Sequence, residues 1–224
     1  ERPIIHLEGF KGILQVDGYA GYRKLAERGD VQLAFCWVHV RRNFYKLAMP
    51  GPAPIASEAL QRIAALYAIE NDIRGRSAAE RRIVRQQKSR PLIDALEPWL
   101  RAKLGLVSQK GKLAEAIRYA LSRWEGLTRF LDDGHIELDN NAVERSIRPI
   151  TLNRKNALFA GSDGGAEHWA TIASLIETCK LIGVEPHAYL ADVITRIVNG
   201  HPTGQGDGLL PWAYPAAQDL RHVA

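Results

Sequence analysis

The sequence of 224 residues predicts an α/β protein that is mostly helical. Two short apolar runs, at residues 13–16 and 31–38, are typical of buried strands, and a run that is apolar on both faces suits a parallel or mixed sheet. A cluster of Pro and Gly at residues 49–54 then breaks the chain. Beyond it, apolar residues recur at helical spacing to about residue 132, so we expect an all-helical block there.

Composition favours a polyanionic partner and a reducing compartment. The formal net charge is +5 and the sequence pI about 9.3, a balance typical of proteins that bind DNA or other polyanions. The two cysteines, Cys36 and Cys179, are too few for a disulfide framework. We find no apolar run long enough to cross a membrane. A cytoplasmic protein without membrane contact is therefore expected.

Asp17 and Gly18 follow the first predicted strand. Asp-Gly is a common turn former and needs no chemistry. An acid at the carboxyl end of a central strand also lies where α/β folds bind their ligands, and the spacing alone leaves both interpretations open. A short helix at residues 21–28 should lead to the second strand, and a basic helix should follow it at residues 39–47.

Cys36 and His39 have the residue types and the spacing of a pair of metal ligands. One pair cannot complete a tetrahedral zinc site, which needs four ligands, and the neighbouring sequence offers no second pair. A buried thiol and a hydrogen-bonded histidine are therefore the favoured interpretation.

The block beyond residue 54 should contain a helix at 55–73, a second that opens with a Ser77–Glu80 capping box, and a third from about Ser108. Trp124 lies on the apolar stripe of the third element, so it is expected in the core rather than stacked on a base. The stretch from residue 74 to 103 holds nine Lys or Arg against three acids. It is either a solvated helix face or a surface for DNA phosphates.

Residues 137–156 combine amides, a carboxylate and cations in a run that should be helical. Asn140 and Glu144 are four apart, as are Glu144 and Arg148, so they share a helix face. Asn141 and Glu144 also fit a capping box, and on this stretch alone capping is favoured over catalysis. Pro149 should end or kink the helix.

The rest of the chain predicts two further helices. A Gly-rich loop at residues 161–165 precedes a helix at 166–182, and it lacks the Gly-Lys-Ser/Thr of a nucleotide-binding loop. Pro186 should start another helix that runs to residue 198. In the Gly- and Pro-rich tail, residues 209–214 could dock as a short apolar clasp.

Several separate motifs now agree on one resemblance. They lie at residues 14–22 (LQVDGYAGY), 36–44 (CWVHVRRNF), 139–149 (DNNAVERSIRP), 154–165 (RKNALFAGSDGG) and 174–180 (SLIETCK), with 210–212 (LPW) near the end. Each is weak alone, but in this order they resemble transposases of the insertion-sequence-66 (IS66) family, which are of the DDE type. The resemblance covers nearly the whole chain and points to the C-terminal part of the catalytic region.

The resemblance implies a partial ribonuclease-H-like fold with a large all-helical insertion. Residues 1–48 would be the first part of the core, 49–133 the insertion, 134–200 the second part with the acidic helix, and 201–224 a C-terminal tail. The activity implied is the cutting and joining of DNA phosphodiesters with two divalent ions, Mg²⁺ or Mn²⁺. Implied partners are transposon ends and target DNA, a second copy of the chain and accessory proteins of the element, in the cytoplasm of a bacterium and on its nucleoid.

The resemblance also assigns roles to residues. Asp17 would be the second acid of the DDE set and Glu144 the third, and both would be catalytic and hold the metal ions. Cys36 and His39 resemble a signature that follows the second acid in several DDE groups, and Asn140 and Asn141 would orient the carboxylate or DNA. The cations expected to contact DNA are Arg41, Arg42, Arg81, Arg82, Arg85, Arg145, Arg148, Arg154 and Lys155.

One departure from the family pattern concerns the first aspartate of the set. It belongs to a strand upstream of Asp17, and the earlier acids Glu1 and Glu8 have no strand-like context. We therefore expect this chain alone to be inactive or nearly so, with the edge of its first strand exposed. Two alternatives are a non-enzymatic DNA-binding remnant that uses the basic helical insertion, and a helical interaction module.

Overall fold

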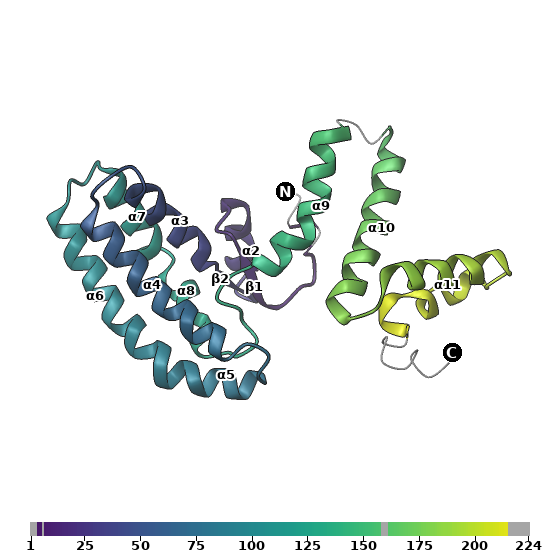
Figure 1. The fold of residues 1–224 in the computed structure, drawn as a ribbon, viewed down its shortest axis with the longest axis horizontal. Helices are drawn as coiled ribbons and strands as arrows, with labels where there is room; N and C mark the ends of the chain where they lie inside the picture. The colour runs from purple at the N-terminus through teal and green to yellow at the C-terminus, as the bar shows by residue number, and fades with distance from the viewer. Residues whose placement is uncertain (1–3, 6, 158–160, 215–224) are drawn as a thin grey trace. The chain divides into compact units, whose positions relative to one another are not determined.

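The computed structural model describes residues 4–5, 7–157 and 161–214, without the side chains of 153–157. The chain forms two compact units, Glu1–Ala142 and Val143–Ala224, and each is described by itself (Figure 1). Helices dominate both units, and the strands described form one small sheet in the first. The prediction of a mostly helical α/β protein is confirmed. The ribonuclease-H-like topology and the four-part division of the chain stay predictions.

Two parallel strands open the first unit. β1 (Gly12–Val16) pairs with β2 (Val31–Phe35) in a register that runs from Gly12↔Val31 to Val16↔Phe35. The short helices η1 (Ala20–Tyr22) and α2 (Arg23–Ala26) lie in the crossover that parallel strands require. The second strand ends earlier than predicted, because α3 already begins at Trp37, with Cys36 as its N-cap.

The helical part of the first unit follows the predicted order with more breaks. It consists of α3 (Trp37–Ala48), α4 (Pro54–Asp72), α5 (Ala78–Val84), the π-helical turn η2 (Arg85–Ser89), α6 (Arg90–Leu106), α7 (Lys112–Leu121), α8 (Trp124–Thr128) and η3 (Arg129–Leu131). Ser77 and Glu80 form the predicted capping box at the start of α5. Trp124 begins its own helix instead of continuing α7, and Pro98 lies inside α6.

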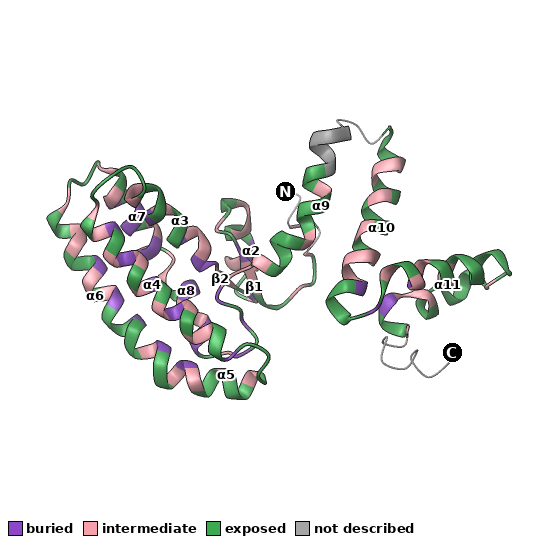
Figure 2. Cartoon of the chain, in the orientation of Figure 1, coloured by how far each residue is buried: buried purple, intermediate pink, exposed green. Residues whose placement is uncertain are grey.

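The core of the first unit lies between α3, α4, α6 and α7 (Figures 1 and 2). Trp37 is fully buried, its Nε1 donates to the Leu127 carbonyl oxygen at 2.8 Å, and its ring meets Trp124 edge-on. Trp124 packs against this core, which confirms the prediction of a core role. Because α8 packs on β2 and Arg129 Nε donates to the Leu33 carbonyl oxygen at 3.0 Å, helical residues cover part of the sheet.

After the helical part, the chain returns to the sheet. Gln15 Nε2 donates to the Glu137 carbonyl oxygen at 2.8 Å, and the Trp37 backbone N–H donates to the Leu138 carbonyl oxygen at 3.1 Å. Residues at the end of β1 and the start of α3 therefore anchor the segment that leads into α9 (Asn141–Ala157).

The second unit contains most of α9, then α10 (Asp163–Ile182), α11 (Pro186–Val198) and the short turns η4 (Thr203–Leu209) and η5 (Pro211–Ala213). Pro149, expected to end or kink the helix, lies inside α9, so the structure contradicts an end at this position. Ser162 caps α10 earlier than predicted, through a bond from the Gly165 N–H. No helix among the described residues is both long and apolar enough to cross a bilayer.

A small core closes the second unit. Cys179, Val184 and Tyr189 are buried, and the Tyr214 ring packs edge-on against Tyr189. The Tyr189 hydroxyl donates to the Leu209 carbonyl oxygen at 2.7 Å. The predicted apolar clasp at residues 209–214 is thus confirmed, because this segment docks on α10 and α11.

Candidate catalytic and DNA-binding site

Asp17 lies directly after β1, at the carboxyl end of the parallel pair. Its side chain is exposed, and its Oδ1 accepts a hydrogen bond from the Tyr19 N–H at 3.0 Å. A side-chain oxygen of Asp that accepts from the backbone N–H two residues later is the hydrogen bond of an Asx turn, which is common in Asp-Gly sequences. In the part of the chain that the structure describes, the hydrogen bonds of this carboxylate reach only Oδ1, so Oδ2 is not committed to a protein partner.

The end of α7 lies against this turn. The Tyr119 hydroxyl donates to the Asp17 carbonyl oxygen at 3.2 Å. Burial raises the pKa of Tyr119, Arg123 opposes the rise and Asp17 adds to it, so the hydroxyl keeps its proton at neutral pH. Gly18 has φ +91°, and a Cβ there would lie 2.9 Å from Arg123 Nε. Glycine is therefore required both by the backbone conformation and by the close approach of Arg123.

Glu144 lies in the first turn of α9 and is exposed. It belongs to the second unit, whereas Asp17 belongs to the first. Their convergence on one site, which the sequence suggested, stays a prediction.

Asp139 provides the side-chain contact at the start of α9. Its Oδ1 accepts from the Asn141 N–H at 3.0 Å, and its Oδ2 accepts from Asn141 Nδ2 at 2.8 Å. A carboxylate that binds the first free N–H of a helix stabilises the helix start. The amide of Asn141 is thus held by Asp139, and Oδ1 of Asn140 is buried without a hydrogen bond in the described ranges.

Cys36 is a buried thiol, as predicted, and His39 is half-buried on the first turn of α3. Burial raises the pKa of the Cys36 thiol, the nearby backbone N–H of Asn140 opposes the rise, and the Asp139 charge adds to it. Burial and the Asp139 charge also raise the pKa of Tyr67. A thiol, a hydroxyl and a carboxylate, those of Cys36, Tyr67 and Asp139, therefore lie close together where α3, α4 and the start of α9 meet.

The insertion arginines fall into two groups. Arg85 is fully buried; it binds both carboxylate oxygens of Glu70, with Nε–Oε1 at 2.7 Å and Nη2–Oε2 at 2.6 Å, and its Nη1 donates to two carbonyl oxygens at the end of the helical part. The expected DNA contact of Arg85 is wrong, because an enclosed guanidinium cannot reach a phosphate. Arg81 pairs with Glu137 at 2.8 Å and has 13% of its side chain exposed. Arg82 is exposed and stays a candidate.

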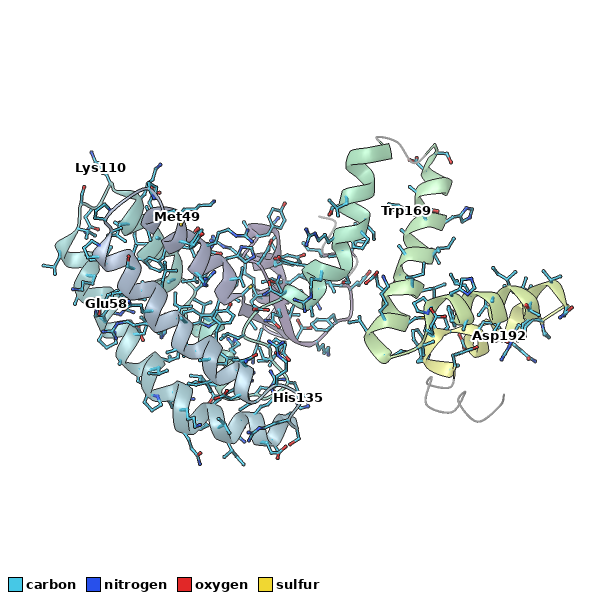
Figure 3. The ribbon with its side chains drawn as sticks, viewed as in Figure 1. Met49, Glu58, Lys110, His135, Trp169 and Asp192 are labelled. Carbon is cyan, nitrogen blue, oxygen red and sulfur yellow. The ribbon has the colours of Figure 1, made fainter. Side chains whose placement is uncertain are left out.

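Other cations of the helical part are also paired within their own helices. Arg62 donates twice to Glu58 of α4, which is labelled in Figure 3, and stacks on the Trp99 ring at 4.8 Å. Arg101 pairs with Glu97 on α6 at 2.6 Å. Because Arg81, Arg85 and Arg101 are paired with carboxylates, the high count of cations between residues 74 and 103 overstates the positive charge that the surface offers to DNA.

The remaining candidate DNA contacts lie on α3 and α9. Arg41 and Arg42 are exposed on α3, and Arg41 lies over the Tyr45 ring at 5.8 Å. Arg145 and Arg148 are exposed on α9. The side chains of Arg154 and Lys155 lie outside the part of the chain that the structure describes.

The donor set around Asp17 fits a divalent ion in part. Mg²⁺ and Mn²⁺ prefer carboxylate oxygens with several waters retained, and an exposed carboxylate with one uncommitted oxygen suits that chemistry. Within the described ranges, however, no three His, Cys, Asp or Glu side chains are close enough to form a metal site. Asp17 would need carboxylates brought from elsewhere.

The comparisons with known proteins agree with the motif order. The family model described as "Transposase IS66 family" matches residues 1–168, and the one described as "IS66 C-terminal element" matches residues 174–212. The chain belongs to the IS66 transposase family. The acid after β1 and the acidic helix α9 both lie within the larger of the two matched IS66 regions.

Curated IS66-like relatives come from Sinorhizobium fredii. The proteins named "Uncharacterized protein y4qI" and "Uncharacterized protein y4jD" are 48% and 45% identical to this chain, over 93% and 95% of its length. The chain covers 40% and 43% of these relatives, so it spans about two fifths of their length. No solved structure matches the chain.

Sequence reasoning missed Tyr119 and Arg123, which contact the Asp17 turn. Both lie more than a hundred residues from Asp17 along the chain. The available signal was their spacing of four, which places an aromatic ring and a cation on one helix face. The IS66 motifs quoted above do not include them, so only the fold reveals their position.

Proposed function

We propose that this chain is the C-terminal part of the catalytic region of a DDE-type DNA transposase with a ribonuclease-H-like core. The observation that carries the proposal is the position of Asp17, an exposed acid at the carboxyl end of a parallel strand inside the region matched to the IS66 family. Ligands of open α/β sheets bind at this end of the strands.

Asp17 and Glu144 would hold the divalent ions, Mg²⁺ or Mn²⁺. Further carboxylates, which are not close to Asp17 in the described residues, would complete the set of ligands. Bound there, such ions supply a nucleophile at neutral pH and stabilise the leaving oxygen of a phosphodiester. The Tyr19 N–H orients the Asp17 carboxylate through Oδ1. Tyr119 fixes the backbone of the same turn through the Asp17 carbonyl oxygen.

DNA would be held by the exposed cations of α3 and α9, in particular Arg41, Arg42, Arg145 and Arg148. Their contacts with phosphates would make binding weaken as salt rises. The partners proposed are transposon ends, target DNA and a second copy of the chain, because joining two DNA ends requires both to be held at once.

A metal titration tests the proposal. Thermal unfolding of this chain should shift upward as Mg²⁺ or Mn²⁺ is added, by about 2.7 kcal/mol at a hundredfold excess over the dissociation constant. Asp17→Asn and Glu144→Gln should each abolish the shift. Asp94→Asn, at an exposed acid on α6, should leave it intact. An equal shift in all four proteins would overturn the proposed metal site.

The alternative is a DNA-binding remnant without chemistry that uses the basic insertion. The ion pairs of Arg81 and Arg85 with Glu70 and Glu137 weaken it, because they remove two of the three insertion cations it relied on. Salt-sensitive DNA binding in the absence of any metal response would favour this alternative. Binding that falls away in Arg82→Ala alone would locate it on α5.

A further inference from the structure

A pocket of about 320 Å³ adjoins the Asp17 turn. The crossover after β1, the end of β2 and the junction of α7 and α8 form its walls. The residues that line it include Gly18, Tyr19, Arg23, Phe35, Ser122 and Arg123. All of these belong to the first unit, so the pocket is complete within it.

Arg123 is held rigidly at this pocket. Its guanidinium carbon lies 3.9 Å from the centre of the Tyr119 ring and 5.9 Å from that of Phe35. Its Nη1 donates to the Tyr119 carbonyl oxygen at 3.3 Å and to Ser122 Oγ at 3.1 Å. These contacts fix the plane of the guanidinium and leave Nη2 and Nε to serve a ligand.

The charge of Arg123 is uncompensated. Arg85, Arg90 and Arg129 of the same unit each pair with a carboxylate. Across the described ranges, no carboxylate pairs with Arg123, and Arg23, which also lines the pocket, lacks one too. Two unpaired cations in one pocket repel each other and favour an anion between them.

The remaining wall is aromatic. Tyr19 is 64% exposed, and its ring meets Tyr22 edge-on, which restricts its motion. An exposed ring beside two guanidinium groups matches the needs of a nucleotide, whose base stacks on aromatic faces and whose phosphate binds arginine. Because Gly18 lies in the wall, the pocket is one residue from Asp17.

We propose that this pocket binds one nucleotide of a single DNA strand beside Asp17, with its phosphate on Arg123 and Arg23 and its base on the Tyr19 ring. The inference rests on the proposed function in one respect: it takes Asp17 as a catalytic residue, so that the DNA strand bound beside it is the one that reacts. The end of α7, which belongs to the helical insertion, would then position the DNA strand beside Asp17. This role would be separate from any DNA contact made by the exposed surface of the insertion.

Binding of a fluorescein-labelled single-stranded oligonucleotide of about 12 nucleotides to the whole chain tests the pocket. Arg123→Gln should weaken binding about tenfold and lower the slope of log affinity against log salt by about 0.7, the loss of one phosphate contact. Ser122→Glu should weaken binding similarly, because it adds a carboxylate beside Arg123 and keeps the arginine in place. Arg101→Gln, at a paired surface arginine outside the pocket, is the control.

The outcomes separate the two proposals. If the wild type binds the oligonucleotide and both Arg123→Gln and Ser122→Glu bind it equally well, the proposed nucleotide pocket is wrong. The metal titration is independent of this result. If Arg123→Gln unfolds the chain, Ser122→Glu alone decides, since Ser122 is exposed. Weaker binding in both variants, with the control unchanged, supports the pocket even if Asp17→Asn retains its metal response. No oligonucleotide binding at low salt overturns the pocket.

Discussion

Helices dominate both units of this IS66 family chain, but the two units have very different cores. In the first unit, helices from four parts of the sequence enclose a continuous set of buried side chains (Figure 2). Among the described residues of the second unit, the buried cluster has only three members, Cys179, Val184 and Tyr189. Many large apolar side chains of its helices remain exposed, among them Val143, Ile147, Ile172, Leu181, Ile194, Ile197 and Val198. Helix content therefore says little about how much apolar surface a unit buries, which is what stabilises it.

The largest expected effect lies in the first unit, at Arg85. Arg85→Ala removes both hydrogen bonds of Arg85 to the nearly buried Glu70 carboxylate and leaves it only the longer contact with Arg81, so the free energy of unfolding should fall by about 3–5 kcal/mol. Arg82→Ala, at an exposed arginine three residues earlier, should change it by less than about 0.5 kcal/mol. Urea denaturation of both variants measures the difference. Equal effects would mean that the Arg85 ion pair contributes nothing to the first unit.

The second unit should respond to a smaller change. Tyr189→Phe removes one buried hydroxyl and its hydrogen bond to Leu209, at a cost of about 0.5–1.5 kcal/mol. Because that unit has its own small core, the change should appear in the unfolding of the α10–α11 region and spare the helices of the first unit. Hydrogen exchange of backbone amides measures the opening of the α10–α11 region separately from that of the first unit. Loss of protection across both units would show that they unfold together.

The smallest effect concerns the dependence of stability on pH. The Ser77 hydroxyl and backbone N–H hold the pKa of Glu80 below its ordinary value of 4.5. A carboxyl whose pKa is lowered by folding contributes stability above its unfolded pKa, and the contribution is lost as the pH falls through the folded pKa. Below about pH 4.5, Glu80→Gln should therefore lose less stability than the wild type does. Denaturation at several acidic pH values tests this, with Asp94→Asn as the control.

Local sequence patterns predicted most elements. The strands, the Ser77–Glu80 capping box, the helix after Pro186 and the apolar clasp all follow from the period of apolar residues and from cap residues, which act within a few positions. The misplaced ends have local causes that period alone does not reveal. α3 begins directly after Cys36 and so ends β2, and α9 continues on both sides of Pro149.

The family could be predicted from the order of the motifs, and so could the candidate acid Asp17. The role of Arg85 could not, because a buried arginine and an exposed one have the same local sequence. Glu70 and the carbonyl groups of Phe130 and Asp133, distant in the chain, decide that Arg85 is structural. The same holds for Asp139, whose proximity to the buried Cys36 thiol and to the hydroxyl of the half-buried Tyr67 the local sequence does not reveal.

By itself, the sequence determined that this protein is a mostly helical α/β chain of the IS66 family with an acid at the end of its first strand. Apolar periods, caps and motif order are properties of neighbouring residues, so they can be read directly. Only the tertiary structure decided that Tyr119 and Arg123 lie against Asp17 and that Arg85 does not face solvent. These facts depend on which helix surfaces pack together. Packing brings together residues that are far apart along the chain, and nothing in the local sequence indicates which of them will meet.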